Sequence, residues 1–231
     1  MAKKHANTLT DKRLKMLLDE VVSTNPNPLP MRVAFMLSFY AGLRVAEIAG
    51  LDWRMHVMGN DGEFRVSDFP VYDVSGEVLR DSDNEIITTP VESLFIGSDI
   101  GKCGMSRVVP LKDDLKVALR ALFDDSRGAE DFPSKPHVIP SAHNGANQQL
   151  TRRAHALKMR INRIYVRLGL QGCTSHSGRR SFITRASQKA NAVGMSLRDV
   201  QALAGHRNLT TTEAYIDVSD QHNVLVNVLW T

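Results

Sequence analysis

The chain has 231 residues, of which 42% are hydrophobic and 23% charged, and its formal net charge is +4; these values are ordinary for a globular protein. Residues 1–13 contain no apolar stretch, which excludes a signal peptide, and the longest apolar run, residues 31–43, carries Arg32 and is too short to span a bilayer. We therefore expect a cytoplasmic protein without a membrane partner, in which Cys103 and Cys173 are free thiols.

The N-terminal part of the chain is predicted to be helical. Thr10 is a suitable N-cap for a helix over about 11–23. The apolar residues of this helix share one face: Leu14, Leu17, Leu18, Val21 and Val22. The proline-rich residues 25–30 end it and start a buried helix over 31–41, and a further short helix is expected within 42–53.

Residues 53–111 are predicted to form a small antiparallel sheet. Five strand-like pieces, separated by Gly, Asp, Asn and Ser, fall in this region: WRMHVM, EFRVSDF, EIITTPV, SLFIG and SRVVPL. Within the region, residues 61–99 contain ten acidic and two basic side chains. This segment should therefore avoid a polyanion.

The rest of the chain is predicted to return to helix after Pro110. Residues 125–148 are rich in loop-forming residues, and helical periodicity resumes at Thr151. Three glycines stand where helix C-caps would belong: Gly169, Gly194 and Gly205. No internal repeat or linker is evident, so we predict a mainly α protein with a small antiparallel β-sheet, an α+β fold, in a single domain over residues 1–231.

Basic side chains are concentrated in the C-terminal part. Residues 151–231 hold twelve Lys or Arg and four Asp or Glu, whereas residues 1–150 hold 17 basic and 21 acidic side chains. A basic surface favours a polyanionic partner because contacts with phosphates release counterions, although a solvated helix surface would have the same composition. The candidate contacts to a nucleic acid are Arg152, Arg153, Lys158, Arg180 and Arg207.

Four short pieces carry side chains suited to catalysis. The pieces are GLRVAEIAGL with Arg44 and Glu47, GKCGMSRVVPL with Lys102, TSHSGRRSFIT with His176 and Arg179, and LAGHRNLTTTEAY with His206 and Tyr215. Each piece alone has an ordinary explanation, such as a surface ion pair, a solvated lysine, a histidine at a helix start or a half-buried tyrosine.

Together and in this order, the pieces resemble the tyrosine recombinase (phage integrase) family. That family has an arginine in a G-L-R-x-x-E-[IL] helix and a lysine in a G-K-x-x-x-x-R-x-V-P-L hairpin turn. An H-x-x-R helix, a G-H pair and a tyrosine nine residues after that histidine follow. The hairpin matches in register at Gly101, Lys102, Arg107, Val109, Pro110 and Leu111. The resemblance covers about residues 9–220 and implies a tyrosine recombinase catalytic-domain fold.

The resemblance implies a site-specific DNA recombinase or integrase of a phage or mobile element, in which Tyr215 forms a covalent 3′-phosphotyrosyl link. Arginine is suited to balancing the charge of the phosphate, which indicates Arg44 and Arg179. Imidazole is suited to proton transfer and hydrogen bonding, so His176 is expected to assist Tyr215 and His206 to donate to a phosphate oxygen.

The remaining catalytic positions complete this scheme. Lys102, in its turn, is expected to protonate the leaving 5′-oxygen, and Glu47 is expected to hold Arg44 or His176 in place. These residues supply positive charge without a divalent ion, and the covalent link conserves the bond energy. We therefore expect no metal, no cofactor and no ATP.

The sequence departs from the family pattern in three ways. Arg180 stands where many members have histidine. Arg44 and Lys102 are 58 residues apart, roughly twice the usual spacing, which indicates an acidic insertion over about 56–98. About eight residues precede the first predicted helix, so we expect this chain to lack an N-terminal core-binding domain. It would then be either an excised catalytic domain or a naturally short member of the family. A C-terminal tail over about 220–231 would pack on its own domain or on a neighbour.

Two other functions remain open from the sequence. A type IB topoisomerase-like enzyme would use the same chemistry to relax DNA, and residues 196–216 also read like the helix–turn–helix of a non-catalytic DNA-binding regulator. The expected partner is double-stranded DNA, bound by a protein that is a monomer in solution and a tetramer on paired sites. Accessory DNA-bending proteins and a nucleoid location in a prokaryotic cell would accompany this role.

Overall fold

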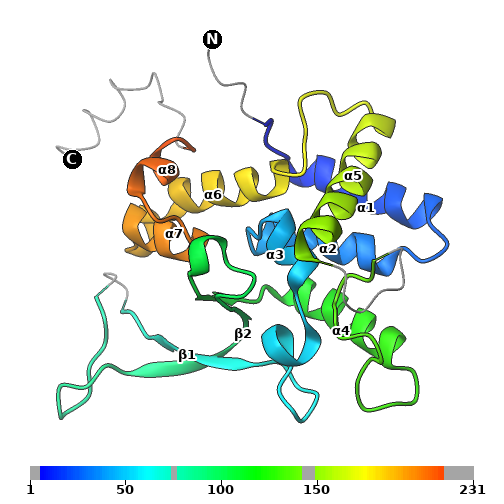
Figure 1. Ribbon diagram of the computed structural model, residues 1–231. Helices are drawn as coiled ribbons and strands as arrows, with labels where there is room; N and C mark the ends of the chain where they lie inside the picture. The colour runs from blue at the N-terminus through cyan, green and yellow to red at the C-terminus, as the bar shows by residue number, and fades with distance from the viewer. Residues whose placement is uncertain (1–5, 74–76, 142–148, 216–231) are drawn as a thin grey trace, which may run out of the picture.

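The computed structural model describes residues 6–73, 77–141 and 149–215 (Figure 1). The helices in these ranges are α1 (Asp11–Thr24), α2 (Leu29–Tyr40), α3 (Val45–Gly50), α4 (Asp113–Arg127), α5 (Leu150–Arg167), α6 (Ser177–Lys189), α7 (Leu197–Ala204) and α8 (Leu209–Glu213). The strands are β1 (Val66–Pro70), β2 (Thr88–Ile96) and β3 (Arg107–Pro110). The predicted mainly α fold with a small antiparallel sheet is confirmed.

The first helix begins and ends close to its predicted bounds. The Thr10 side chain accepts a hydrogen bond from the backbone N–H of Arg13 at 3.3 Å, which caps the N-terminus of α1. Leu14, Leu17 and Val21 are buried, and α1 packs against α2 and α5. The apolar periodicity of residues 11–23 therefore predicts the centre of the buried face, whereas Leu18 is only partly buried and the prediction for Val22 is wrong, because its side chain is 48% exposed.

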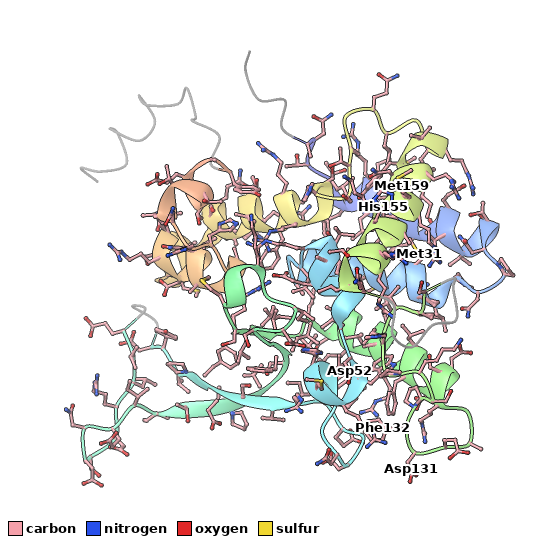
Figure 2. The ribbon with its side chains drawn as sticks, in the orientation of Figure 1. Met31, Asp52, Asp131, Phe132, His155 and Met159 are labelled. Atoms are coloured by element: carbon pink, nitrogen blue, oxygen red, sulfur yellow. The ribbon has the colours of Figure 1, made fainter. Side chains whose placement is uncertain are left out.

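The main core lies between α2 and the helices that pack on it. Helix α2 contacts α1, α4 and α6, and α3 packs against α5. Figure 2 labels residues on a buried and on an exposed helix face. Met31 of α2 is buried in the core, whereas His155 and Met159 of α5 are exposed. A second, smaller apolar cluster joins α6 and α7 through Ile183, Ala190, Val200 and Ala204.

The sheet has the strand order β1-β2-β3, and both pairs are antiparallel. The second half of EIITTPV, from Thr88, and SLFI form one continuous strand, β2. The predicted strand WRMHVM is wrong, because Trp53–Val57 forms a π-helical turn. The Asp52 carboxylate caps this turn by accepting the backbone N–H groups of Arg54 and Met55, and Trp53 and Val57 are both buried.

Residues 58–92 are here called the acidic arm; they contain β1, the start of β2 and three loops. The first loop packs on α4, where Arg120 bonds Glu63 and the Gly62 carbonyl, and β1 and β2 extend from there away from the helices (Figure 1). Each loop is closed by an isolated bridge between residues six positions apart: Met58 with Phe64, Tyr72 with Val78, and Arg80 with Ile86. The described residues of the predicted insertion over 56–98 thus include β1, β2 and three bridged loops.

The loops of the acidic arm use the same local chemistry. In the third loop, the Asp81 carboxylate accepts the backbone N–H groups of Asp83 and Glu85, and Asn84 adopts φ 65°. In the first loop, Asp61 accepts the N–H of Glu63, and a glycine takes the left-handed position. The acidic residues that give the arm its charge therefore also build its turns.

None of the helices within the described ranges is long and apolar enough to cross a membrane. The predicted tail over 220–231 lies outside the described residues. The prediction of a single domain without an N-terminal core-binding domain stays a prediction.

Candidate active site

Three arginines meet at the C-terminal end of α7. The carbonyl oxygen of Leu203 accepts Nε of Arg107 at 3.1 Å, that of Ala204 accepts Nη2 of Arg179 at 2.7 Å, and that of Gly205 accepts Nη2 of Arg44 at 2.9 Å. The last carbonyls of a helix lack partners within it and form the negative end of its dipole. The end of α7 therefore holds arginines from three distant parts of the chain.

Gly205 makes this arrangement possible. It has φ 63° and ψ 48°, a left-handed conformation that ends α7, and its backbone N–H donates to the carbonyls of Ala202 and Gln201. A Cβ atom at Gly205 would lie 2.8 Å from Nη1 of Arg107. The predicted C-cap thus serves both the turn into His206 and the close approach of an arginine.

Glu47 joins two of the three arginines. Its carboxylate accepts Nη1 of Arg44 at 2.8 Å and binds Arg107 through both oxygens, at 2.9 Å each. The side chain is 1% exposed. Burial would raise the pKa of Glu47, but the hydrogen bond and charge of Arg107, followed by those of Arg44, outweigh it and lower the pKa to about 2. Glu47 is therefore a buried anion that holds Arg44, one of its two expected partners, rather than His176.

A surface pocket of about 120 Å³ opens above this network. Its lining residues are Arg44, Lys102, Met105, Gly205, His206, Arg207, Asn208 and Thr211. Lys102 starts the short turn η2 (Lys102–Gly104) between β2 and β3, and its side chain is exposed. The pocket has the size and positive charge to receive an anionic group such as a phosphate.

His206 lies between the arginines and Tyr215. It is buried, and its Nδ1 lies 2.9 Å from Oγ1 of Thr212. Burial and the charges of Arg179, Arg44 and Arg107 lower the pKa of His206 to about 4. The ring is therefore neutral at physiological pH and can act as a hydrogen-bond donor without adding charge.

Tyr215 stacks on His206. The ring centroids lie 5.6 Å apart with an interplanar angle of 24°. The Arg180 guanidinium lies 5.6 Å from the Tyr215 ring centroid, and Oγ1 of Thr184 donates to the Tyr215 carbonyl at 3.2 Å. The ring also packs on the small cluster between α6 and α7. Tyr215 is thus placed beside the pocket by α6 and α8, at the end of the described residues.

The two members of the H-x-x-R pair lie at the start of α6. Arg179 is 3% exposed and donates to the Gly42 carbonyl at 2.5 Å in addition to Ala204. Burial and the charge of Arg44 lower the pKa of Arg179 to about 10, which leaves it protonated at neutral pH. His176 is accessible to solvent, and its pKa is lowered by partial burial and by the charges of Lys158 and Arg179.

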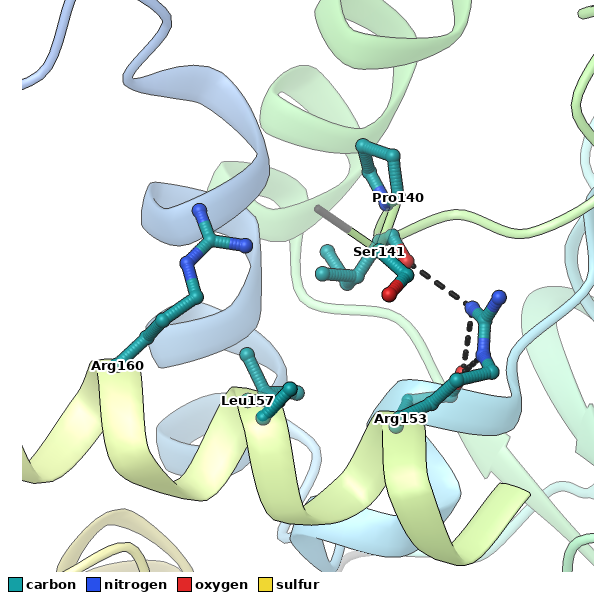
Figure 3. A pocket seen from close by; sticks show the side chains of 8 residues that line it. Pro140, Ser141, Arg153, Leu157 and Arg160 are labelled. Atoms are coloured by element: carbon teal, nitrogen blue, oxygen red, sulfur yellow. Dashed lines mark hydrogen bonds between the residues drawn. The ribbon is translucent and has the colours of Figure 1, made fainter. Parts of the chain in front are cut away.

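The candidate DNA contacts divide into accessible and buried residues. Arg152, Lys158 and Arg207 are exposed, and Arg180 is half-buried beside Tyr215. The prediction for Arg153 is wrong, because this side chain is 7% exposed and donates to the carbonyls of Ala49 and Ile139 (Figure 3).

The buried position of Arg153 follows from helical spacing. It lies four residues before Leu157 and eight before Ile161, both of which are buried on the inner face of α5. This periodicity could have identified Arg153 as a core residue from the sequence. Among the described residues, no group of three or more His, Cys, Asp or Glu side chains could hold a metal ion.

The structure also brings Arg107 into the site, although the sequence pattern predicts no role for it. Arg107, the first residue of β3, binds both Glu47 and the end of α7. The available sequence signal is its register within the hairpin motif, but spacing alone does not show which distant carboxylate an arginine will meet.

Several known recombinases are similar to this chain. Tyrosine recombinase XerC of Xanthomonas campestris pv. campestris (strain B100) is 29% identical over 206 residues, which cover 89% of this chain and 49% of the relative. The chain thus spans about half the length of the curated relatives it matches. XerC of Roseiflexus castenholzii (strain DSM 13941 / HLO8) is 35% identical over 124 residues, covering 53% of this chain and 37% of the relative.

Solved structures share the fold. The XerH site-specific recombinase bound to palindromic difH substrate matches with a TM-score of 0.62 at 18% identity, covering 100% of this chain and 54% of that chain. A lambda integrase tetramer bound to a Holliday junction matches with a TM-score of 0.58 at 16% identity, covering 94% and 50%. Residues 7–222 also match the model of the phage integrase family, and on this evidence the chain belongs to that family.

Proposed function

We propose that this chain is a site-specific DNA recombinase or integrase that cuts and rejoins DNA strands through a covalent 3′-phosphotyrosyl intermediate. One observation carries the proposal: Arg44, Arg179 and His206 gather at the end of α7, with Tyr215 stacked on the histidine. Lys102 lines the same pocket. A regulator that only binds DNA has no need for this combination.

The reaction transfers a phosphoryl group from a 5′-oxygen to a phenol oxygen. Tyr215 Oη forms a bond to phosphorus as the bond to the 5′-oxygen breaks, and the phenol proton passes to His176. Lys102 gives a proton to the leaving 5′-oxygen. Rejoining reverses these steps with a 5′-hydroxyl from another strand, so the number of phosphodiester bonds is unchanged.

The arginines and His206 act on the charge of the phosphate. Arg44 lines the pocket, whereas Arg179 is 3% exposed, does not line it and uses two of its five N–H groups on carbonyls. We propose that the remaining N–H groups of both arginines bind phosphate oxygens. When the Thr212 hydroxyl donates to Nδ1 of His206, the imidazole proton lies on Nε2 and can be donated to a non-bridging oxygen.

We further propose double-stranded DNA as the substrate and partner. Arg152, Lys158, Arg180 and Arg207 would contact its backbone. The protein would be a monomer in solution and would form a tetramer on paired sites, with accessory DNA-bending proteins as further partners. The structural neighbour on a Holliday junction supports such an assembly, because that integrase is a tetramer. A cytoplasmic, nucleoid-associated location fits this role.

Covalent capture tests the proposal on DNA of any sequence. The protein is incubated in EDTA with a pool of nicked duplexes whose sequence around the nick is randomised, and DNA that survives denaturation with SDS is recovered. We expect enriched sequences bound covalently to the parent protein. Tyr215→Phe should yield no adduct, whereas Tyr72→Phe, at an exposed tyrosine of the acidic arm, should behave like the parent.

The outcomes separate the three functions. An adduct that is as abundant in Tyr215→Phe as in the parent would remove Tyr215 as the nucleophile. Enrichment of DNA without any covalent link would favour the non-catalytic regulator. Relaxation of supercoiled plasmid without joining of two sites would favour a type IB topoisomerase-like enzyme.

A further inference from the structure

We propose that Arg107 is a positioning residue of this active site: by occupying both oxygens of Glu47, it keeps the charge of Arg44 available to the DNA phosphate. The inference rests on the function proposed above and assigns a role to a residue outside the expected catalytic set. It does not require Arg107 to touch DNA.

The guanidinium of Arg107 is enclosed by acceptors of the protein. Its side chain is 8% exposed, and Nε, Nη1 and Nη2 each donate to a protein acceptor at 2.9–3.1 Å. Gly205 lies directly against its guanidinium. Arg107 does not line the pocket, whereas Arg44 does. The Arg107 guanidinium therefore binds groups of the protein, and Arg44 is the arginine that can contact the phosphate.

Charge balance explains why this contact matters. Glu47 carries one negative charge and contacts two guanidinium groups, with two bonds to Arg107 and one side-chain bond to Arg44. Bidentate pairing is the strong geometry for an arginine and a carboxylate. Without Arg107, the partners of Glu47 are the backbone N–H of Arg44 on Oε2 and the guanidinium of Arg44 on Oε1. The full charge of the carboxylate would then act on Arg44, neutralise it and turn it from the pocket.

Arg107 also ties the lysine turn to the rest of the site. It is the first residue of β3, where it pairs with Ile96 of β2, and it follows Lys102 by five residues. The intervening turn is tight, because the Gly101 N–H donates to the Gly97 carbonyl at 2.8 Å and a Cβ at Gly101 would collide with the Met105 carbonyl. One side chain thus fixes the strand that leaves the lysine turn against α3 and α7.

Single-turnover cleavage and DNA binding should separate this role from a phosphate contact. In Arg107→Met we expect cleavage to fall by about 10- to 100-fold, the usual cost of losing a residue that orients an active-site group. DNA affinity should fall a few-fold, and the slope of its logarithm against log salt should fall by about one phosphate contact, because Arg44 then pairs with Glu47 and no longer contacts the phosphate. Arg44→Ala should reduce that slope by the same amount, and the double variant Arg44→Ala/Arg107→Met should have the salt slope of Arg44→Ala alone, because Arg107 acts through Arg44.

Two variants control for charge and for folding. Arg107→Lys keeps the positive charge but lacks the planar fork, so we expect a melting temperature near that of the parent and a cleavage rate near that of Arg107→Met. Arg120→Met removes an arginine that pairs with Glu63 and the Gly62 carbonyl, away from the pocket. It should cleave at the parent rate.

A titration of Glu47 by NMR tests the network without DNA. Because Arg107 is the main group that lowers the pKa of Glu47, this pKa should rise in Arg107→Met. If the parent forms no adduct, the proposed function fails. If the pKa of Glu47 is the same in Arg107→Met as in the parent, Arg107 does not stabilise the Glu47 carboxylate and the proposed network is wrong. Parent-like cleavage by Arg107→Met or Arg107→Lys, or a salt slope in the double variant that is smaller than in Arg44→Ala alone, would overturn the positioning role.

Discussion

The end of α7 and the acidic arm organise charged side chains in opposite ways. At the end of α7, each arginine binds a carbonyl or carboxylate that is distant in sequence, as Arg44 binds Gly205 and Arg179 binds Gly42. In the loops of the acidic arm, the carboxylates of Asp61, Asp73 and Asp81 accept backbone N–H groups two to four residues away. The first region depends on the whole fold, and the second is built locally. Substitutions should therefore affect cleavage in the first region and not in the second.

The largest expected effect follows from loss of Arg44. In Arg44→Ala, cleavage should fall by about 100- to 1,000-fold, the usual cost of removing a group that stabilises transition-state charge. DNA binding should fall only a few-fold, because many other contacts remain. Single-turnover rates and equilibrium binding on the same duplex measure the two effects. Equal losses in both would reduce Arg44 to an ordinary phosphate contact.

Two glycines with the same φ angle give a matched comparison. Gly205 and Gly169 both have φ 63°, so alanine should cost roughly 1–2 kcal/mol of stability at either position. Only at Gly205 would the new methyl group meet Arg107, since no atom lies within 4 Å of a Cβ at Gly169. We expect cleavage to fall about tenfold or more in Gly205→Ala and to be unchanged in Gly169→Ala. Parallel behaviour of the two variants would contradict the role given to the α7 turn.

The lowered pKa of His206 predicts that the free energy of unfolding decreases in acid. Its pKa is lowered from 6.5 to about 4 in the folded state, so between these values the unfolded chain binds a proton that the folded chain excludes. Stability linked to His206 is therefore complete above pH 6.5 and is lost as the pH falls toward 4. We expect roughly 1–2 kcal/mol, less than the full shift because solvent screens part of it.

Urea denaturation at pH 7 and pH 4.5 measures this term. His206→Gln cannot titrate at this position, so its free energy of unfolding should change less between the two pH values than that of the parent. An identical change in both proteins would show that the buried imidazole does not carry the effect.

The smallest expected effect on cleavage comes from the acidic arm. Pro70 and Thr88 are cross-strand partners, so residues 71–87 can be replaced by an Asn-Gly turn. Cleavage should change by less than about threefold, since the pocket is left intact. DNA affinity should increase at low salt and return to the parent value at high salt, because the removed segment is acidic and its repulsion is screened. Loss of cleavage would show that the arm belongs to the active site.

The features that the sequence predicts best are those that depend on local spacing. The cap at Thr10, the amphipathic face of α1 and the end of α7 at Gly205 all follow from near neighbours along the chain. The π-helical turn at Trp53–Val57 resembles a strand in sequence, because a strand and a helical turn would both bury Trp53 and Val57. The cap that the Asp52 carboxylate provides favours the helical turn.

Contacts between distant elements are harder to predict. Arg153 and Arg152 are neighbours in a basic run, yet one donates to core carbonyls and the other is exposed. Composition treats them alike, and only the helical face separates them. In the same way, the hairpin motif contains Arg107, but its partners Glu47 and Leu203 lie 60 and 96 residues away. Their meeting is a property of the packed helices.

The central claim is that the guanidinium of Arg44 balances the charge of the phosphate that Tyr215 attacks. It is tested most directly by replacing the scissile phosphate with an uncharged methylphosphonate and comparing covalent-adduct formation by the parent and Arg44→Ala. If Arg44 acts on that charge, the difference of about 100- to 1,000-fold on normal DNA should shrink to about tenfold or less on the neutral substrate. A difference that persists in full on the methylphosphonate would contradict the account.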